Sequence, residues 1–475
     1  MTVEYDLVVI GGGSAGLVVA SAAAQLKAKV ALVEKHRLGG DCLWFGCVPS
    51  KSLIQASRIA YQVKHSDRFG IYTQPPQIDF PKTIDYVQDV IKAIEPNDSQ
   101  IRFRGLGVNV IFGEGQFIDP KTFLVNQQKL TARAFVIATG SRAKIPAIKD
   151  LEDVGYLTNE QVFTLSQQPK SLAIIGTGPI GCELGQAFQR LGTQVTLIGS
   201  QEKLLSKEDP EVAQVVEQQF IQEDIKIFKN AKIEKVSLNN SKKCLWIGDH
   251  QIIADEILVA AGRTPSIESL NLEAAKVQFN QKGIEVNSKL QTTNPKIYAC
   301  GDVIGGYQFT HVAGYEASIV IQNALFFPFK KTNYRVIPWT TFTDPEVARV
   351  GLTEQQAREQ YGDEIVILKQ DFYHVDRAQA ENATEGFAKI ITRNNGEILG
   401  GHIVGASAGE LIHEIVLAMT QKLSVSALGG IHVYPTLSEV NSKAALLLTK
   451  QKYAKNQPLQ NSLARLFSVL RKWSF

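Results

Sequence analysis

The sequence predicts an α/β fold with two Rossmann-like dinucleotide-binding domains, followed by a C-terminal α+β domain. Three observations carry this prediction: the length of 475 residues, a Gly-x-Gly-x-x-Gly fingerprint that occurs twice, and a change of pattern near residue 335. A chain of this length is too long for one hydrophobic core, so about three domains are expected.

The first fingerprint lies in residues 5–16, YDLVVIGGGSAG, where a buried strand is followed by Gly11, Gly13 and Gly16 at the start of a helix. The strand KVALVE then ends at Glu34. In such a unit the glycines make the turn, let the backbone approach a pyrophosphate and let helix pack on strand. The helix N-terminus holds the phosphates, and Glu34 can accept hydrogen bonds from ribose hydroxyls.

The second fingerprint, SLAIIGTGPIG at 171–181, places Gly176, Gly178 and Gly181 in the same context, 165 residues further on. One such motif is weak evidence, because incidental glycine turns occur, but two in strand–helix context indicate two dinucleotides. Hydride transfer needs one cofactor as donor and another as acceptor.

The two sites differ in the residue that would meet the ribose. Glu34 lies 23 residues after Gly11, whereas the same offset from Gly176 reaches Gly199. A carboxylate would repel a 2′-phosphate, so its absence favours NADPH over NADH at the second site. The polar residues that follow Gly199 are Ser200, Gln201 and Lys203. The alternative is that Gly199 only begins a turn.

The remaining patterns complete the domain prediction. Strands are expected at 134–141, 256–265 and 292–303, and beyond residue 335 strands with turns precede an amphipathic helix at 410–423.

The net charge of +3 gives no reason to expect a nucleic acid partner. Residues 7–26 carry no charge, but Glu4 and Asp6 precede them and glycines interrupt them, so a strand, turn and helix are expected rather than a membrane span.

The segment GGDCLWFGCVPSK at 39–51 holds two of only five cysteines, Cys42 and Cys47. Such sparse cysteines indicate a reducing, cytoplasmic location. In a regular helix these Cα atoms would be about 8–9 Å apart, whereas a disulfide needs roughly 4.4–6.8 Å. The loop is therefore expected to be distorted at Gly46. A helix is predicted from about Val48, so its amides and Lys51 would stabilise a Cys47 thiolate. A redox pair is favoured, with a metal site or two inert thiols as alternatives.

Taken together, these motifs, with ATG at 138–140 and ACGD at 299–302, resemble the pyridine nucleotide–disulfide oxidoreductases. This is the family of glutathione reductase, dihydrolipoamide dehydrogenase and mercuric reductase, and residues 1–450 are most similar to the mercuric reductase branch. The resemblance implies a homodimer with FAD in the first site and NAD(P)H in the second. It implies these segments: 1–150, first part of the FAD-binding domain; 151–270, NAD(P)-binding domain; 271–334, second part of the FAD-binding and central domain; 335–450, interface domain; 451–475, basic amphipathic tail.

The resemblance also assigns roles to single residues. Cys47 would be the thiolate facing the flavin, Cys42 would meet the substrate, and Lys51 would lie near the flavin, paired with Glu183. Without the resemblance, Lys51 and Glu183 are ordinary helix residues. Arg263 would have a structural role. The residues expected to bind FAD are Gly11, Gly13, Ser14, Gly16, Glu34, Gly40, Lys51, Thr139, Gly140, Asp302, His311 and Ala313. Those expected to bind NAD(P) are Gly176, Gly178, Gly181, Ser200, Lys203 and Gly262.

Near the C-terminus the sequence departs from the disulfide reductases. These carry His-Pro-Thr-x-x-Glu, whereas this chain reads YPTLSE, with Tyr434 in place of the histidine and Glu439 retained. Tyrosine is a poor base near neutral pH. His432 would substitute only if its loop turned inward, and Tyr434 is alternatively a packed interface residue.

A second departure concerns mercury. Mercuric reductases carry a C-terminal cysteine pair, but here the last cysteine is Cys300, so efficient Hg(II) reduction is not expected. No metal ligands are predicted, and Cys182, Cys244 and Cys300 are interpreted as structural.

The tail has an amphipathic pattern, with Leu463, Leu466, Phe467, Leu470 and Trp473 at helical spacing. Such a helix fits an anionic membrane or a partner, or it packs on its own protein.

The sequence thus predicts an oxidoreductase that passes electrons from NAD(P)H through FAD and a Cys42–Cys47 disulfide to a disulfide, metal-ion or quinone-type acceptor. A dihydrolipoamide dehydrogenase or glutathione-reductase-type enzyme is the alternative. A redox-sensing binding protein is the alternative of another class.

Overall fold

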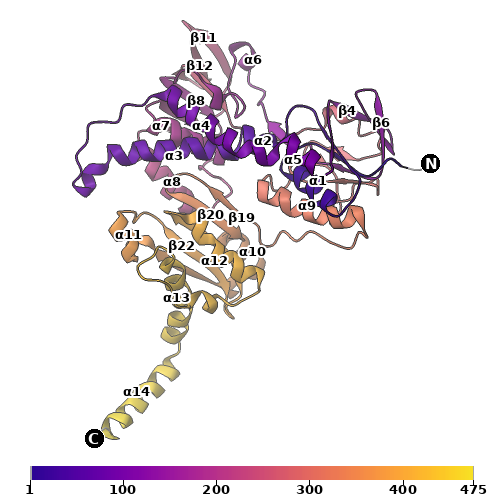
Figure 1. Cartoon of the computed structure of the whole chain (residues 1–475). Coiled ribbons are helices and arrows are strands. Elements are labelled where there is room, and N and C mark those ends of the chain that lie inside the picture. Colours follow the sequence, from indigo (N-terminus) through magenta and orange to yellow (C-terminus); the bar gives the residue numbers. More distant parts are fainter. Residues whose placement is uncertain (1–2, 474–475) are drawn as a thin grey trace. The chain divides into compact units, whose positions relative to one another are not determined.

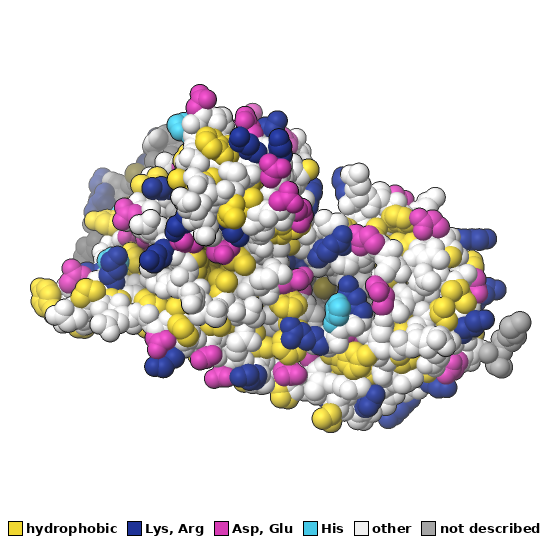
Figure 2. Space-filling view, turned by 90° about the horizontal axis from the view of Figure 1, so that it is seen from above, with side chains coloured by type: hydrophobic (Ala, Val, Ile, Leu, Met, Phe, Trp, Pro, Cys, Tyr) yellow, Lys and Arg dark blue, Asp and Glu magenta, His cyan; other side chains and the backbone are white. Residues whose placement is uncertain are grey.

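The computed structural model describes residues 3–473 and divides into two compact units (Figure 1). The first comprises Met1–Glu202 and Ile225–Asn333, and the second comprises Lys203–Asp224 and Tyr334–Phe475. Figure 2 shows basic and acidic side chains interspersed over one face, in keeping with the small net charge.

A seven-stranded sheet forms the centre of the first unit, in the order β3-β2-β1-β6-β5-β4, with β18 beside β6. The strands β1, β2, β3, β18 and the end of β6 run parallel. The buried runs of Val, Ile and Leu in β1 and β2 suit a sheet covered on both faces. Their bounds are β1 Tyr5–Ile10, β2 Val30–Glu34, β3 Asn109–Phe112, β4 Gly115–Asp119, β5 Thr122–Val125, β6 Gln128–Ile137 and β18 Ile297–Ala299.

Helices α1 (Ser14–Gln25) and α9 (Thr310–Leu325) lie side by side and share one hydrophobic core with this sheet (Figure 1). The uncharged run 7–26 is therefore split between β1 and α1, as predicted. Among the described residues, no helix combines the length and apolar character that a membrane crossing requires.

The second fingerprint also folds as a βαβ unit, in a parallel sheet with the order β10-β9-β8-β14. Its elements are β8 Ser171–Ile175, α7 Pro179–Arg190, β9 Gln194–Ile198, β10 Lys226–Phe228 and β14 Glu256–Val259. Between β10 and β14, the chain forms a three-stranded antiparallel sheet. Its strands are β11 Lys235–Asn239, β12 Lys242–Ile247 and β13 His250–Ala254.

The cysteine segment forms two helices of the first unit, α2 (Gly40–Trp44) and α3 (Cys47–Lys64). Helix α3 packs against α4 (Phe80–Ile94) and α7, so it connects the cysteine segment to the second fingerprint. Smaller elements of this unit are α5 Gln100–Gly105, α6 Leu151–Val154, β7 Ser141–Ala143, β15 Arg263–Pro265, β16 Phe279–Asn280 and β17 Gly283–Ile284.

The second unit is built on a five-stranded antiparallel sheet, in the order β19-β20-β23-β22-β21. Every residue of β23 is buried, because helices cover this strand. The strands are β19 Pro338–Thr341, β20 Glu346–Gly351, β21 Ile365–Asp371, β22 Phe387–Arg393 and β23 Ile398–Gly405. The helices are α8 Pro210–Gln222, α10 Glu354–Tyr361, α11 Asp376–Glu381, α12 Ala408–Thr420, α13 Glu439–Lys455 and α14 Gln457–Trp473. The strands and the helix expected beyond residue 335 are confirmed. The five segment limits predicted from the sequence stay a prediction.

Charged side chains are buried between α8 and this sheet. The Lys389 ammonium is 1% exposed and lies 2.5 Å from Asp209 and 2.6 Å from Glu211. His402 is fully buried, with its ring nitrogens 3.2 Å from Glu208 and 3.0 Å from Asp209. Burial by itself would raise the pKa of Glu208 and Asp209, but hydrogen bonds and charge from His402, with Arg349 beside Glu208 and Lys389 beside Asp209, lower the pKa of both carboxyls.

Replacing Lys389 with methionine should destabilise the second unit by about 3–5 kcal/mol, because the three carboxylates of Asp209, Glu211 and Glu354 lose their buried cation. Lys369→Met is a matched control, since Lys369 pairs with the same Glu211 but is 39% exposed; its loss should cost under about 1 kcal/mol. Urea unfolding followed by tryptophan fluorescence measures both. Equal losses of unfolding free energy in the two variants would contradict the prediction that a buried cation contributes more than an exposed one.

The lowered pKa values also set a pH dependence. Because the folded pKa lies below the unfolded values of 3.8 for Asp209 and 4.5 for Glu208, their contribution is complete above pH 4.5 and is lost as pH falls through the folded pKa.

Candidate active site

A break between two helices brings the cysteines together. Cys42 lies in the short helix α2, which ends before Phe45, and Cys47 is the first residue of α3. Gly46 occupies the break, where a Cβ would lie 3.0 Å from the Asp41 carbonyl oxygen. Both thiols are free, and they are hydrogen-bonded to each other. The predicted distortion at Gly46 is confirmed.

The two thiols have opposite acidities. The hydrogen bond from Cys42 lowers the pKa of Cys47 to about 6, against partial desolvation. The Thr310 hydroxyl, 3.3 Å from the Cys47 sulfur, and the charge of Lys51 act in the same direction as that bond. The same cysteine hydrogen bond and burial raise the pKa of Cys42. Near neutral pH, Cys47 is therefore a thiolate and Cys42 a thiol, which is the distribution that a redox pair requires.

One helical turn after Cys47, the Lys51 ammonium donates a hydrogen bond to Glu183 of α7 at 2.8 Å. Glu183 is 7% exposed and Lys51 is 37% exposed, so the pair lies at the margin of the core. The ion pair joins the cysteine helix to the helix that opens at the second fingerprint. Lys51 thus places a positive charge near the cysteine thiolate.

The first fingerprint forms a cradle that only glycines permit. A Cβ on Gly11 would overlap the Ala138 carbonyl, and one on Gly16 would overlap the carbonyl of Gly11. Gly13 and Gly40 approach each other so closely that a Cβ on Gly40 would lie 2.6 Å from the Gly13 Cα. Gly13 caps α1 without a side-chain hydrogen bond, and Ser14 begins the helix. Backbone amides at this end of α1 fit the phosphates of a dinucleotide.

Glu34 ends β2 beside this cradle. Its carboxylate accepts hydrogen bonds from the backbone amides of Gly12 at 2.7 Å and His36 at 2.8 Å. A carboxylate has about four lone-pair sites, so these bonds orient Glu34 and leave capacity for ribose hydroxyls.

A second carboxylate, Asp302, follows β18. Ser141 donates a hydrogen bond to it at 2.6 Å, and Arg263 lies 3.5 Å away. Burial raises the pKa of Asp302, against these two groups. Arg263 also lies 3.1 Å from Asp41, so it connects Asp302 to the cysteine segment.

The other residues expected at the first dinucleotide lie on the same unit. Thr139 donates a hydrogen bond to the Ser266 carbonyl at 2.7 Å, and Gly140 has a φ of +69°. On α9, Ala313 is buried, and the exposed His311 stacks on Phe309 with 5.5 Å between ring centroids. The glycine cradle, the carboxylates and the uncapped helix start fit FAD.

The second fingerprint repeats the cradle. A Cβ on Gly176 would overlap the Ala260 carbonyl, and Gly178 caps α7 without a side-chain hydrogen bond. Gly181 likewise lies against the carbonyl of Gly176, and Gly262 has a φ of +112°. These features fit a second dinucleotide.

The residues expected to select the coenzyme, Gly199, Ser200 and Lys203, have different surroundings. A Cβ on Gly199 would overlap the Thr177 side chain, so this glycine has a packing reason that is independent of the coenzyme. Ser200 is exposed. Lys203 belongs to the second unit, where it donates a hydrogen bond to the Glu208 carbonyl at 2.7 Å.

In the second unit, the Tyr434 hydroxyl donates a hydrogen bond to Asp376 at 3.0 Å. This bond and the nearby negative charge raise the pKa of Tyr434, so the phenol is not a base. Glu439 accepts a hydrogen bond from the Thr436 amide. His432 has Gly430 carbonyl oxygen 2.9 Å from one ring nitrogen and Glu414 3.3 Å from the other. Both nitrogens of His432 are engaged.

Sequence reasoning missed Thr310, Asp41 and Ser141. Thr310 contacts the Cys47 sulfur from 263 residues away, and no local pattern identifies it. Asp41 adjoins Cys42, and its charge next to a reactive thiol was the available signal. It accepts a hydrogen bond from Asn159 at 2.9 Å.

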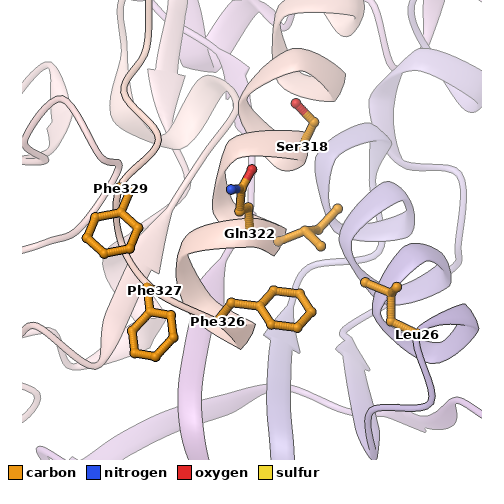
Figure 3. A pocket seen from close by; sticks show the side chains of 7 residues that line it. Leu26, Ser318, Gln322, Phe326, Phe327 and Phe329 are labelled. Atoms are coloured by element: carbon orange, nitrogen blue, oxygen red, sulfur yellow. The ribbon is translucent and has the colours of Figure 1, made fainter.

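The remaining cysteines, Cys182, Cys244 and Cys300, are buried. A separate surface pocket of about 360 Å³ lies between α1 and α9 (Figure 3). It is lined mainly by apolar side chains, and none of the predicted site residues belongs to it.

Comparisons with known proteins place these observations in context. Residues 5–317 match the model of the pyridine nucleotide-disulphide oxidoreductases, and residues 337–445 match that family's dimerisation domain. The chain is 37% identical to mercuric reductase of Staphylococcus aureus over 94% of this chain and 83% of that protein. It is 34% identical to dihydrolipoyl dehydrogenase of Geobacillus stearothermophilus over 93% of this chain and 96% of that protein. The Cu(II) complex of the HOCl-induced flavoprotein disulfide reductase RclA from Escherichia coli superimposes with a TM-score of 0.84 at 27% identity, covering 94% and 100% of the chains.

The split acidities can be measured by alkylation. In the reduced protein, iodoacetamide should modify Cys47 with a midpoint near pH 6, and Cys42 should react only at much higher pH. Lys51→Met should raise the Cys47 midpoint by about one pH unit, because it removes a nearby cation. Peptide mapping by mass spectrometry gives both midpoints, with buried Cys300 as the unreactive reference. Equal midpoints for Cys42 and Cys47 would contradict the hydrogen-bonded arrangement.

Proposed function

The chain belongs to the pyridine nucleotide-disulphide oxidoreductases, and from this membership we propose that Cys42 and Cys47 carry electrons from NAD(P)H to a metal-ion or quinone-type acceptor. Members of the family use FAD and NAD(P)H, and the chain is an oxidoreductase with these cofactors. The observation that carries the proposal is the low pKa of Cys47 beside a protonated Cys42 at the start of α3.

Two separate sets of residues support the binding of the two cofactors. Gly11, Gly13, Gly16, Glu34 and Asp302 would hold FAD, and the glycines at 176, 178 and 181 would hold the nicotinamide coenzyme. When bound, the flavin conveys electron pairs between the nicotinamide and the cysteines. Gly199 has its own packing reason against Thr177, but no carboxylate at position 199 would repel a 2′-phosphate, so we propose NADPH as the coenzyme. Initial rates with NADPH and NADH test this preference.

The cysteines supply the exchange of protons and electrons. Two electrons break the Cys42–Cys47 disulfide, Cys42 takes one proton because its pKa is raised, and Cys47 remains a thiolate. Delivery of two electrons to an acceptor re-forms the disulfide and releases that proton. Lys51 compensates negative charge at Cys47, and Glu183 orients Lys51. We place Lys51 and Glu183 as supporting residues.

Two side chains of the second unit, Tyr434 and His432, bear on the class of electron acceptor. Tyr434 is engaged with Asp376, and both nitrogens of His432 are engaged, so neither is a ready proton donor and acceptor for a thiol. A metal ion or a quinone needs less proton transfer from the protein than a disulfide does. The relatives include mercuric reductases, and one of the similar solved structures is a Cu(II) complex. Residues 301–475 contain no cysteine, so a C-terminal cysteine pair is not part of the proposal.

Replacing Cys47 with serine should abolish acceptor reduction and the long-wavelength absorbance of the two-electron-reduced enzyme, because no thiolate remains. Cys42→Ser is the matched variant: it cannot form the disulfide, so it should show this absorbance while its flavin is still oxidised, and it should lose turnover. Stopped-flow spectra and steady-state NADPH oxidation give the two readouts. Retention of both signals in Cys47→Ser would exclude the relay, whereas a wild type without turnover on any acceptor would favour a redox sensor.

The acceptor assignment predicts low activity with lipoamide and glutathione disulfide. Tyr434→His should raise that activity by about a hundredfold, because it supplies an acid–base group with a pKa near neutrality. Tyr434→Phe is the control and should give no increase. Assays with Hg(II), Cu(II), quinones and both disulfides are compared on the same preparations. A wild type that prefers a disulfide to every metal ion and quinone would contradict the assignment.

A further inference from the structure

The C-terminal helix α14 is unlike the other long helices of the second unit. Its seventeen residues, Gln457–Trp473, include none that is buried. Figure 1 shows it extending beyond α13 with no other element of its unit alongside. Within the second unit, the tail therefore buries none of its residues. We propose that α14 lies flat on an anionic membrane surface and attaches the enzyme peripherally to it.

The apolar face of α14 needs a cover. Leu459, Leu466, Leu470 and Trp473 recur at helical spacing, and between 43% and 77% of each residue is exposed. Phe467 and Val469 flank this stripe and are also about half exposed. Removing such a stripe from water is favourable, and an amphipathic helix achieves this by lying at the boundary between lipid headgroups and acyl chains.

The charge of the chain after Glu439 indicates what kind of surface covers the apolar face of α14. After Glu439 the chain contains no acidic residue, but it contains five lysines and two arginines. On the helical projection, Arg465 and Lys472 lie opposite Leu459, on the polar face. Lys450, Lys452 and Lys455 precede α14 at the end of α13. This charge is complementary to anionic lipid headgroups, whereas the same helix of a second copy would repel it.

The composition favours lying on the surface over crossing it. No helix in the described part of the chain can span a bilayer. Trp473 and Phe467 are side chains that prefer the interface, and the polar face with Arg465 and Lys472 would remain in the headgroup region. A quinone-type acceptor would be concentrated at such a surface, but the attachment does not depend on that assignment.

Co-sedimentation of the full-length holoenzyme with vesicles tests the proposal. Vesicles of phosphatidylcholine with about one third phosphatidylglycerol are compared with pure phosphatidylcholine at low and high salt. We expect binding to the anionic vesicles, reduced about tenfold by high salt or by the double change Arg465→Gln with Lys472→Gln. Leu466→Gln with Leu470→Gln should abolish it, because both changes lie on the apolar face.

The matched control is Asn461→Gln with Ser468→Gln, which places the same side chains on the polar face and should bind as the wild type does. A chain ending at Asn456 lacks α14 and should not bind, while NADPH oxidation stays unchanged in all variants. Equal sedimentation of the shortened and full-length chains would overturn the proposal and assign binding to another surface. If removing α14 instead changes the oligomeric state in analytical ultracentrifugation without lipid, a second copy covers the helix and the proposal is wrong.

Discussion

The Cys42 and Cys47 thiols share one hydrogen bond, and its direction decides which sulfur carries negative charge near neutral pH. The bond exists because Gly46 interrupts the helix between them. In one continuous helix the two residues would be about 8–9 Å apart, too far for a disulfide. The interruption also makes Cys47 the first residue of α3, where backbone amides favour a thiolate. A single backbone feature therefore brings the pair together and contributes to its unequal acidity, to which Thr310 and Lys51 also contribute.

The surroundings of the cysteines connect them to both dinucleotide cradles. Lys51 on the cysteine helix pairs with Glu183 of α7, which opens at the second fingerprint. Arg263 bridges Asp41, next to Cys42, and Asp302, at the end of β18. These contacts join residues more than 100 positions apart in the sequence, within one compact unit. Electron transfer between two cofactors and a disulfide requires such fixed positions, and the ionic contacts provide them alongside the packing of α3 on α7.

The second unit contains Tyr434 and His432, the residues considered for proton transfer to a thiol. The family resemblance implies a histidine in a His-Pro-Thr-x-x-Glu motif, and this chain carries Tyr434 in its place. The structure engages Tyr434 with Asp376 and engages both nitrogens of His432, so proton transfer is the function that this unit supplies least. The same unit buries Lys389 and His402 among carboxylates. Helix α14 of this unit has no buried residue.

The sequence by itself determined the two fingerprints, the cysteine pair and the family, because each of these depends on residues that are neighbours in the chain. Glycines at Gly11 and Gly16 are required by local backbone contacts, so their spacing indicates the fold directly. The helix start at Cys47 and the break at Gly46 were likewise predictable from nearby residues. The pairing of Lys51 with Glu183 came only from the family resemblance, since either residue alone is an ordinary helix residue.

Only the tertiary structure decided what depends on residues distant in the chain. The contact of Thr310 with the Cys47 sulfur brings together the first residues of α9 and α3, which are 263 residues apart, and no local pattern encodes it. The sequence indicates Gly199 only as the missing carboxylate of the coenzyme site, whereas its packing against Thr177 gives it another reason that the sequence does not reveal. The amphipathic pattern of the tail was visible in the sequence, yet its exposure was not, because a pattern shows which face is apolar and only the fold shows whether that face is covered.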